Sequence, residues 1–133
     1  MARVSAKPRP RRRHEEHDNQ AMVVKWAAIM EHKYPALKLL FAVPNAGIAG
    51  GARRGGWLKA EGVKAGVPDL MLPAFHATYR GLAIEMKTKT GVVSREQKAW
   101  HEMLREYGWC VAVCRSAEEA IETISRYLGI PTA

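Results

Sequence analysis

The stretch at residues 81–87, GLAIEMK, constrains the fold most, because it is an apolar run that ends in two opposite charges. On a β-strand successive side chains point to opposite faces, so Glu85 and Lys87 share one face while Ile84 and Met86 share the other. An apolar strand is an expensive place for a charge. The pair is therefore either a structural ion pair or part of a binding site.

A second strand is predicted over residues 69–73, after the turn Gly66-Val67-Pro68-Asp69. Residues 69–73 and 81–87 are well spaced for an antiparallel hairpin. Asp69, at the start of the first strand, would then lie opposite the end of the second strand, close to Glu85. The hairpin would bring two carboxylates and one lysine together.

The other elements favour a mixed sheet with helices on its faces. Helical spacing predicts helices over residues 15–32, 94–107 and 116–128, and the last two begin with capping-box patterns. Apolar runs at 37–43 and 109–114 predict two more strands. The order helix, three strands, helix, strand, helix predicts a single α/β domain with a mixed β-sheet flanked by helices.

The first helix supplies one more carboxylate. Its predicted buried positions include Met22, Val24 and Ile29. Glu16 and Gln20, four residues apart, share a face at the edge of this stripe and could look into a site. An acid in the first turn is also favoured by the helix dipole alone, so a purely structural role for Glu16 stays open.

Positive charge is concentrated at the start of the chain. The net charge is +8, and residues 1–13 contain only basic charges. We expect a disordered tail over 1–13, with Arg11, Arg12 and Arg13 available for DNA phosphates, and one domain over 14–133. A solubility tail without a partner is the alternative.

No apolar run approaches the roughly 20 residues needed to cross a bilayer, so a cytoplasmic protein without membrane contact is expected. Cys110 and Cys114 are expected to be free thiols. Residues 45–56 contain five glycines together with Arg53 and Arg54. No packed element is expected there, and the segment could be either a phosphate-gripping loop or an exposed connector.

The clustered charges suit phosphodiester hydrolysis. Asp69 and Glu85 offer the oxygen ligands that Mg²⁺ prefers, and the Met86 backbone carbonyl could add a third. A metal beside a scissile phosphate polarises it and lowers the pKa of a bound water, and Lys87 could orient that water. An aspartate followed by the ExK pattern also occurs by chance, so an ion pair of little energetic value remains the alternative.

Residues 14–130 resemble the VRR-NUC branch of the PD-(D/E)xK nuclease superfamily, particularly its small stand-alone phage and bacterial members. The similarity runs through EHDNQ at 16–20, PNAG at 44–47 with arginines after it, LKAEGVKAGVPDLMLP at 58–73, GLAIEMK at 81–87 and SREQKAW at 94–100. The PD of the motif corresponds to Pro68-Asp69 and its ExK to Glu85-Met86-Lys87.

The resemblance implies a role for each matching residue. Asp69 and Glu85 would hold Mg²⁺, for which Mn²⁺ would substitute. Lys87 would act on the water, and Glu16 would be an outer-sphere or second-metal carboxylate. Gln97 falls at the helix position that faces the site in the family, although the capping box competes for its side chain.

The resemblance also places Asn45, Arg53 and Arg54 in a loop expected to contact DNA. The family loop often reads PNGG with an arginine soon after, whereas Ala46 replaces a glycine here and Arg53 comes later. Which arginine contacts DNA therefore stays open.

At the level of function, the resemblance implies a restriction-endonuclease-like fold and a Mg²⁺-dependent DNA endonuclease. Stand-alone members resemble homodimers that cut branched DNA such as four-way (Holliday) junctions. Because these members are phage and bacterial proteins, the expected location is the cytoplasm of a bacterium or of a phage-infected host cell. The alternatives are a nuclease for flaps, single strands or duplex DNA, and a non-catalytic DNA-binding module of the same fold.

Overall fold

The computed structural model of the chain describes residues 11–44 and 51–132, with side chains over 14–44 and 56–132. The predictions for residues 1–10 and for Asn45 lie outside the described residues. The side chains of Arg11, Arg12, Arg13, Arg53 and Arg54 also lie outside them.

One four-stranded mixed sheet organises the fold, in the order β1-β2-β3-β4. The strands are β1 (Phe41–Ala42), β2 (Leu70–Leu72), β3 (Leu82–Met86) and β4 (Cys110–Cys114). β2 pairs antiparallel with β1 and β3, and β3 pairs parallel with β4. The predicted hairpin is confirmed, with Leu70 opposite Ile84 and Leu72 opposite Leu82.

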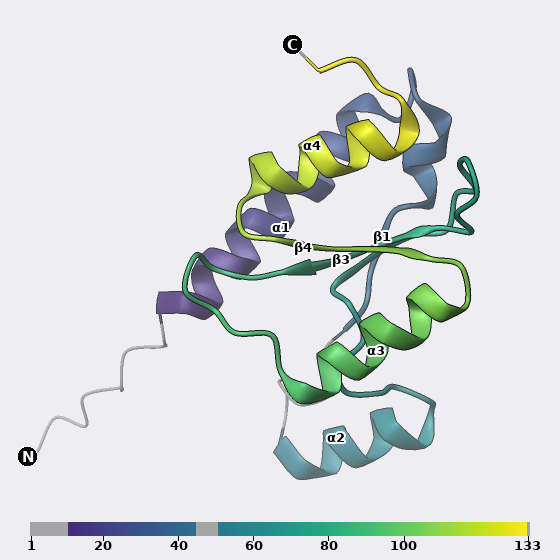
Figure 1. The fold of residues 1–133 in the computed structure, drawn as a ribbon. Helices are drawn as coiled ribbons and strands as arrows, with labels where there is room; N and C mark the ends of the chain where they lie inside the picture. Colours follow the sequence, from purple (N-terminus) through teal and green to yellow (C-terminus); the bar gives the residue numbers. More distant parts are fainter. Residues whose placement is uncertain (1–10, 45–50, 133) are drawn as a thin grey trace, which may run out of the picture.

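Helices cover both faces of the sheet. α1 (Arg11–Met30) and α4 (Ala117–Leu128) lie on one face, and α3 (Arg95–Glu106) lies on the other (Figure 1). The main core lies on the α1/α4 side, where Ile84 and Met86 pack with Val23 of α1 and Ile124 of α4. Period-two alternation therefore turns Glu85 and Lys87 toward the α3 side. The predicted fold class, an α/β domain with a mixed sheet flanked by helices, is confirmed.

The predicted strand at residues 37–43 was mostly wrong. Residues Pro35–Leu39 form a 3₁₀ helix, η1, and only Phe41–Ala42 pair as β1. Pro35 has the fixed φ that suits the first turn of a helix, and it places Leu37 in the core at 2% exposure. The segment therefore forms a helical turn that buries Leu37, although its apolar residues suggested a strand.

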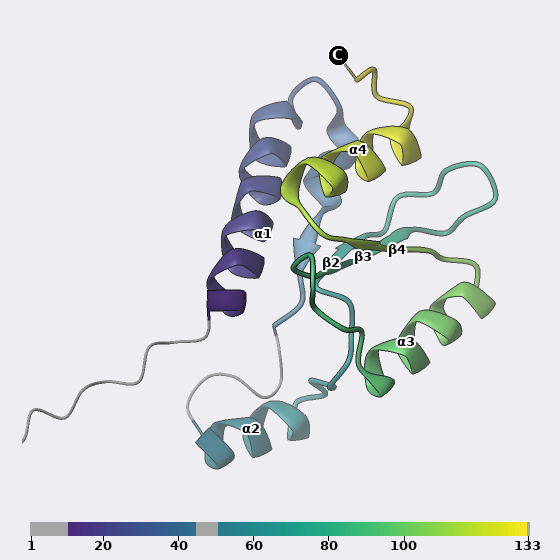
Figure 2. The ribbon, with the colours of Figure 1, turned by 60° about the vertical axis from the view of Figure 1, so that its left-hand side comes forward.

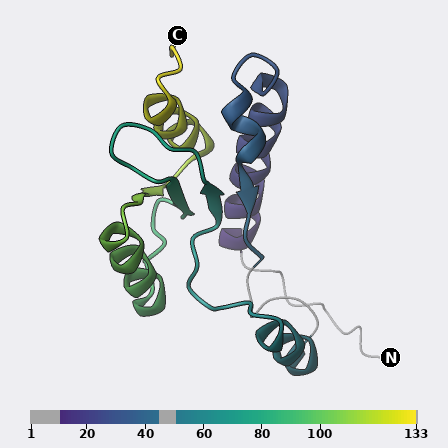
Figure 3. The ribbon, with the colours of Figure 1, turned by 90° about the vertical axis from the view of Figure 1, so that its right-hand side faces the viewer.

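The expectation of no regular element over residues 51–56 was wrong, because α2 (Gly51–Ala60) spans them. Alanine, arginine, leucine and lysine are good helix formers, and they outweigh the glycines in this short segment. Figures 2 and 3 show α2 standing apart from the two helical layers that pack on the sheet. α2 therefore adds one element to the predicted order without changing the core.

α1 differs from its prediction in two respects. It begins at Arg11, so the assignment of residues 11–13 to a disordered tail was wrong; arginine readily continues a helix. Three of the predicted buried positions were also wrong, because Met22, Val24 and Ile29 are between 43% and 58% exposed. The buried residues are Val23 and Ala27, four apart.

The rotation of α1 is set partly by a polar contact with α4. The backbone N–H of Ala117, in the first turn of α4, donates to Asn19 Oδ1 at 3.3 Å. Because α4 begins with N–H groups that lack intrahelical partners, Asn19 supplies an acceptor that they need. The same rotation leaves Glu16 and Gln20 half-buried rather than exposed.

Of the two predicted capping boxes, the one at Ser116 forms only in half: the Ser116 side chain accepts from the Glu119 N–H at 3.1 Å, but Glu119 Oε2 accepts from the N–H of Arg115 at 3.0 Å. Ser94 and Gln97 form the predicted capping box of α3, each side chain bonding the other residue's N–H. Cys110 and Cys114 are free thiols, as expected. Within residues 11–44 and 51–132, no helix is long and apolar enough to cross a membrane.

The loop before β2 depends on a glycine at its contact with α3. Gly66 has φ +86°, and a Cβ built on it would lie 2.8 Å from the backbone carbonyl of Glu96. We predict that Gly66→Ala lowers the free energy of unfolding by about 2 kcal/mol or more, since both the backbone conformation and the close approach are lost.

Gly56→Ala is the matched control, because a Cβ at Gly56 meets nothing within 4 Å and Gly56 lies inside α2. It should cost nothing, since alanine favours a helix. Urea denaturation of the two variants and the parent checks this, and an equal loss in both variants would contradict the packing account.

Candidate active site

Glu85 is a buried acid with unsatisfied bonding capacity. It is 1% exposed, and its Oε1 lies 3.7 Å from Lys87 Nζ, which is too long for a hydrogen bond. Its Oε2 has no partner among the described residues. A buried ion pair is favourable only when its geometry is good and its other lone pairs are satisfied. Glu85 and Lys87 do not satisfy one another, so a structural ion pair is the weaker interpretation.

Asp69 is held against the end of β3 by the backbone. Extending the hairpin register by one pair beyond Leu70 and Ile84 puts Asp69 opposite Glu85. The N–H of Met86 donates to Asp69 Oδ2 at 2.7 Å, and the Asp69 carbonyl accepts from the N–H of Val43 at 2.9 Å. Asp69 is thereby positioned by the strand on each side of it.

Pro68 has no N–H to donate to the Met86 carbonyl. The register places Pro68 opposite Met86, and the Met86 C=O points to the same side as its N–H, toward β2. A non-proline residue there would offer an N–H to this carbonyl, but proline has none. Because Pro68 is buried, the proline of the motif leaves a backbone oxygen beside the two carboxylates without a donor from the ladder.

Negative charge exceeds positive charge in the site. Burial raises the pKa of Glu85 to about 8, with the neighbouring Asp69 as the next cause, and Lys87 opposes the shift. Burial also raises the pKa of Asp69, against the bond from the Met86 N–H. The charge of Glu16 raises both pKa values. Three acids face one lysine, which favours binding of a cation.

Glu16 takes the more distant position among these acids. It reaches the site from α1, and its charge acts on both Asp69 and Glu85. Within the part of the chain whose side chains are described, however, no three His, Cys, Asp or Glu side chains are close enough to hold one metal ion. The role of Glu16, as an outer-sphere or a second-metal carboxylate, stays a prediction.

The donor set fits a hard divalent cation. Asp69 and Glu85 provide two carboxylates, of which Glu85 has a buried oxygen without a partner among the described residues, and Met86 provides a backbone carbonyl opposite Pro68 in the register. Mg²⁺ is commonly held by one or two carboxylates, with waters and substrate phosphate oxygens completing the octahedron. The absence of a third acidic ligand among the described residues is therefore compatible with Mg²⁺.

The side chain of Gln97 takes part in the capping box of α3. Its Oε1 accepts from the N–H of Ser94 at 2.8 Å in the capping box. The amide oxygen is thus engaged at the start of α3, and a role toward the site stays a prediction.

His101 was missed by the sequence analysis. It is the buried residue of α3, with 4% exposure, and its Nε2 has no partner among the described residues. Burial lowers its pKa, and so do the charges of Arg105 and Lys87, so the ring lies in the field of Lys87. Its position four residues after Gln97, on the same helix face, is the sequence signal that could have identified it.

The comparisons with known proteins agree with the fold. A family model described as the VRR-NUC domain matches residues 4–118. A solved structure titled "VRR_NUC domain protein" is 29% identical, with 87% of this chain and 89% of that chain covered and a TM-score of 0.72. No curated protein matches the chain.

The buried charge of Glu85 makes the stability of the metal-free protein depend on pH. The pKa of Glu85 is about 8 in the fold, against an ordinary value of 4.5. Between these values the folded protein holds a proton that the unfolded chain has released, so the free energy of unfolding falls as pH rises through this window. We predict that Glu85→Gln reduces this fall, with Asp69 responsible for what remains.

Urea denaturation in EDTA at pH 5, 6.5 and 8 measures the effect. The variant should equal or exceed the parent in stability at pH 8. MgCl₂ should raise the melting temperature of the parent more than that of Glu85→Gln. A variant that is less stable than the parent at every pH would show that the carboxylate stabilises the fold.

Proposed function

The chain belongs to the VRR-NUC domain family of the PD-(D/E)xK nuclease superfamily, which makes it a nuclease-type protein that acts on DNA, and we propose that it is a Mg²⁺-dependent DNA endonuclease. One observation carries the proposal: Glu85, buried and with an oxygen unpaired, stands beside Asp69 and Lys87 at the ends of two paired strands. A protein that only bound DNA would have no need to bury this charge.

Asp69, Glu85 and the Met86 carbonyl would hold the metal, and Mn²⁺ would substitute for Mg²⁺. When bound, Mg²⁺ supplies polarisation of the scissile phosphate and a lowered pKa for a nearby water. Glu16 would hold further solvent at the outer edge of the site.

Lys87 would act on the attacking water and on the phosphate through its side-chain ammonium, without binding the metal. Its ammonium is mostly buried, with 12% of the side chain exposed, and it lies 3.7 Å from Glu85. An ammonium held in this position can orient the attacking water by hydrogen bonding and stabilise the negative charge that develops on the phosphate. Because burial removes competing water, these interactions are stronger than they would be at the surface.

For the substrate we propose branched DNA, such as a four-way junction, cut by a homodimer. A single site cuts one strand at a time, so paired incisions in a branched molecule need two sites, which a two-fold dimer provides. Flaps, single strands and plain duplex are the competing substrates. Sizing by light scattering tests the dimer, and a strictly monomeric protein would remove the paired-incision proposal.

Cleavage tests the catalytic assignment. We predict that the purified protein cuts labelled four-way junctions in Mg²⁺ or Mn²⁺ and is inactive in EDTA. Asp69→Asn, Glu85→Gln and Lys87→Ala should each lower the rate by about 100-fold or more, since the first two lose a carboxylate that would hold the metal and the third loses the ammonium that would stabilise the transition state. Asp69→Asn keeps an oxygen acceptor for the Met86 N–H, so it separates loss of charge from loss of fold.

Arg126→Gln is the matched control, because Arg126 lies on α4 with 76% of its side chain exposed and pairs with Glu122. It should cut at the parental rate. If no DNA substrate is cut, or if the three site variants cut as well as the parent, a non-catalytic DNA-binding module becomes the better account.

Residues 1–10 test the basic tail separately. Their removal deletes none of the residues that the structure describes. We predict weaker DNA binding with a shallower dependence on salt, by up to about 3 in the slope for Arg3, Lys7 and Arg9. The single-turnover cutting rate at saturating protein should not change. Fluorescence anisotropy across a salt series measures the slope, and an unchanged slope would exclude the tail from DNA contact.

A further inference from the structure

The chain turns sharply immediately after Lys87. The N–H of Lys87 donates to the Cys114 carbonyl at 2.9 Å, and beyond this bond β3 no longer pairs with β4. The next four residues, 88–91, fold back on themselves, with the Gly91 N–H donating to the Thr88 carbonyl at 3.2 Å. We call these residues the 88–91 loop. It joins the catalytic strand to α3.

Arg115 holds this loop from the neighbouring strand. It follows β4 directly, and its Nη1 donates to the carbonyls of Thr88 and Gly91, both at 2.8 Å, with a longer contact of 3.4 Å to the Lys89 carbonyl. Among the residues whose side chains are described, Arg115 makes no salt bridge. Its guanidinium is therefore used on backbone oxygens, and the two N–H groups of Nη1 can serve two carbonyls at once.

Gly91 transmits the position of the loop to Lys87. A Cβ built on Gly91 would lie 3.2 Å from Thr88 Oγ1 and 3.4 Å from Lys87 Cδ. The aliphatic part of the Lys87 side chain therefore lies on the side of Gly91 where a side chain would stand, close enough to contact a methyl group there. If the loop moved, the stem of Lys87 would lose the surface that holds its ammonium near Glu85.

Among the described residues, the hydrogen bonds of the Arg115 guanidinium all go to the 88–91 loop, at the carbonyls of Thr88, Lys89 and Gly91. A long-range charge effect would not depend on the 88–91 loop, whereas a positioning effect requires it.

We propose that Arg115 is a positioning residue for Lys87: it clamps the carbonyls of the 88–91 loop so that Gly91 holds the lysine stem in place. The consequence for catalysis rests on the proposed nuclease function, but the clamp itself does not. A displacement of about 1 Å at a catalytic group can lower a rate 100-fold, so the clamp matters even though Arg115 touches no substrate.

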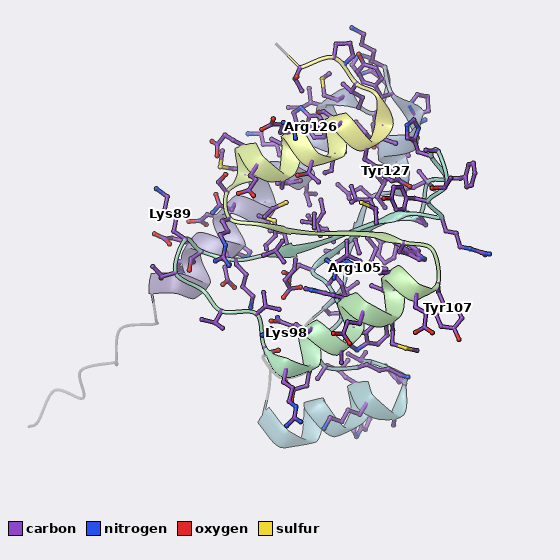
Figure 4. All side chains as sticks on the ribbon, viewed as in Figure 1. Lys89, Lys98, Arg105, Tyr107, Arg126 and Tyr127 are labelled. Carbon is purple, nitrogen blue, oxygen red and sulfur yellow. The ribbon has the colours of Figure 1, made fainter. Side chains whose placement is uncertain are left out.

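Arg115→Met tests the clamp without an activity assay. Competitive acylation by acetic anhydride, read by mass spectrometry, reports how accessible each lysine is. Lys87 should be labelled severalfold faster in Arg115→Met than in the parent. Lys98, which stands on α3 (Figure 4) and is exposed, is the internal reference and should not change. Arg126→Met, on α4, removes an exposed arginine elsewhere and should leave both lysines as in the parent.

The cutting assay adds the catalytic consequence. Arg115→Met should lower kcat by about 10- to 100-fold while KM for DNA changes little, because positioning acts on the chemical step. Arg115→Lys keeps the charge but has a shorter side chain without the Nη1 donor, and should restore less than half of the lost rate. Full restoration of the rate by lysine while Lys87 is still labelled faster than in the parent would mean that Arg115 acts through its charge, which would overturn the proposal.

Gly91→Ala guards against a simple folding defect in Arg115→Met. It leaves Arg115 in place and puts a methyl group against the Lys87 stem, so it should also lower kcat and change the labelling of Lys87. The proposal fails if Lys87 is labelled at the parental rate in both variants. If the parent cuts no DNA, the nuclease proposal fails while the labelling result still decides the clamp.

Discussion

Strand β3 is paired on both sides, antiparallel to β2 and parallel to β4, and this double pairing fixes what its side chains can do. One face carries Leu82, Ile84 and Met86 into the core beneath α1 and α4. The other face presents Glu85 and Lys87 toward α3. Because a strand alternates strictly, neither set can change face without the other, so the core holds the charged pair in place.

The energetic balance explains how a buried acid is tolerated. Full burial of an apolar side chain contributes about 1.5–3 kcal/mol, and β3 buries three of them. Shifting the pKa of Glu85 to about 8 reflects a destabilised charge worth on the order of a few kcal/mol. The two terms are of similar size. The strand can therefore hold an unfavourable carboxylate because its opposite face is well packed, and a bound cation would remove much of the cost.

Backbone groups do as much as side chains in shaping the site. The Met86 N–H fixes Asp69, and Pro68 withholds the donor that would otherwise occupy the Met86 carbonyl. Arg115, in turn, acts on the carbonyls of the 88–91 loop. Such contacts are hard to predict from a sequence, because every residue has a backbone carbonyl and the residue type does not show which carbonyl will be bound. His101 was missed for a different reason: its place on the helix face of Gln97 could be read from the sequence, but its burial depends on how α3 packs on the sheet.

The sequence by itself determined the local features, because these depend on neighbours along the chain. Alternation in residues 81–87, the turn at 66–69 and the spacing of the two strands were enough to place Asp69 beside Glu85 and Lys87 and to predict the mixed sheet. The tertiary structure decided what depends on docking. Packing against α4 rotated α1 so that Val23 and Ala27 are buried instead of Met22 and Val24, and it directed Glu16 to the site. The pairing of β3 with β4 brought Arg115 to the 88–91 loop, a contact between residues far apart in sequence that no local pattern encodes.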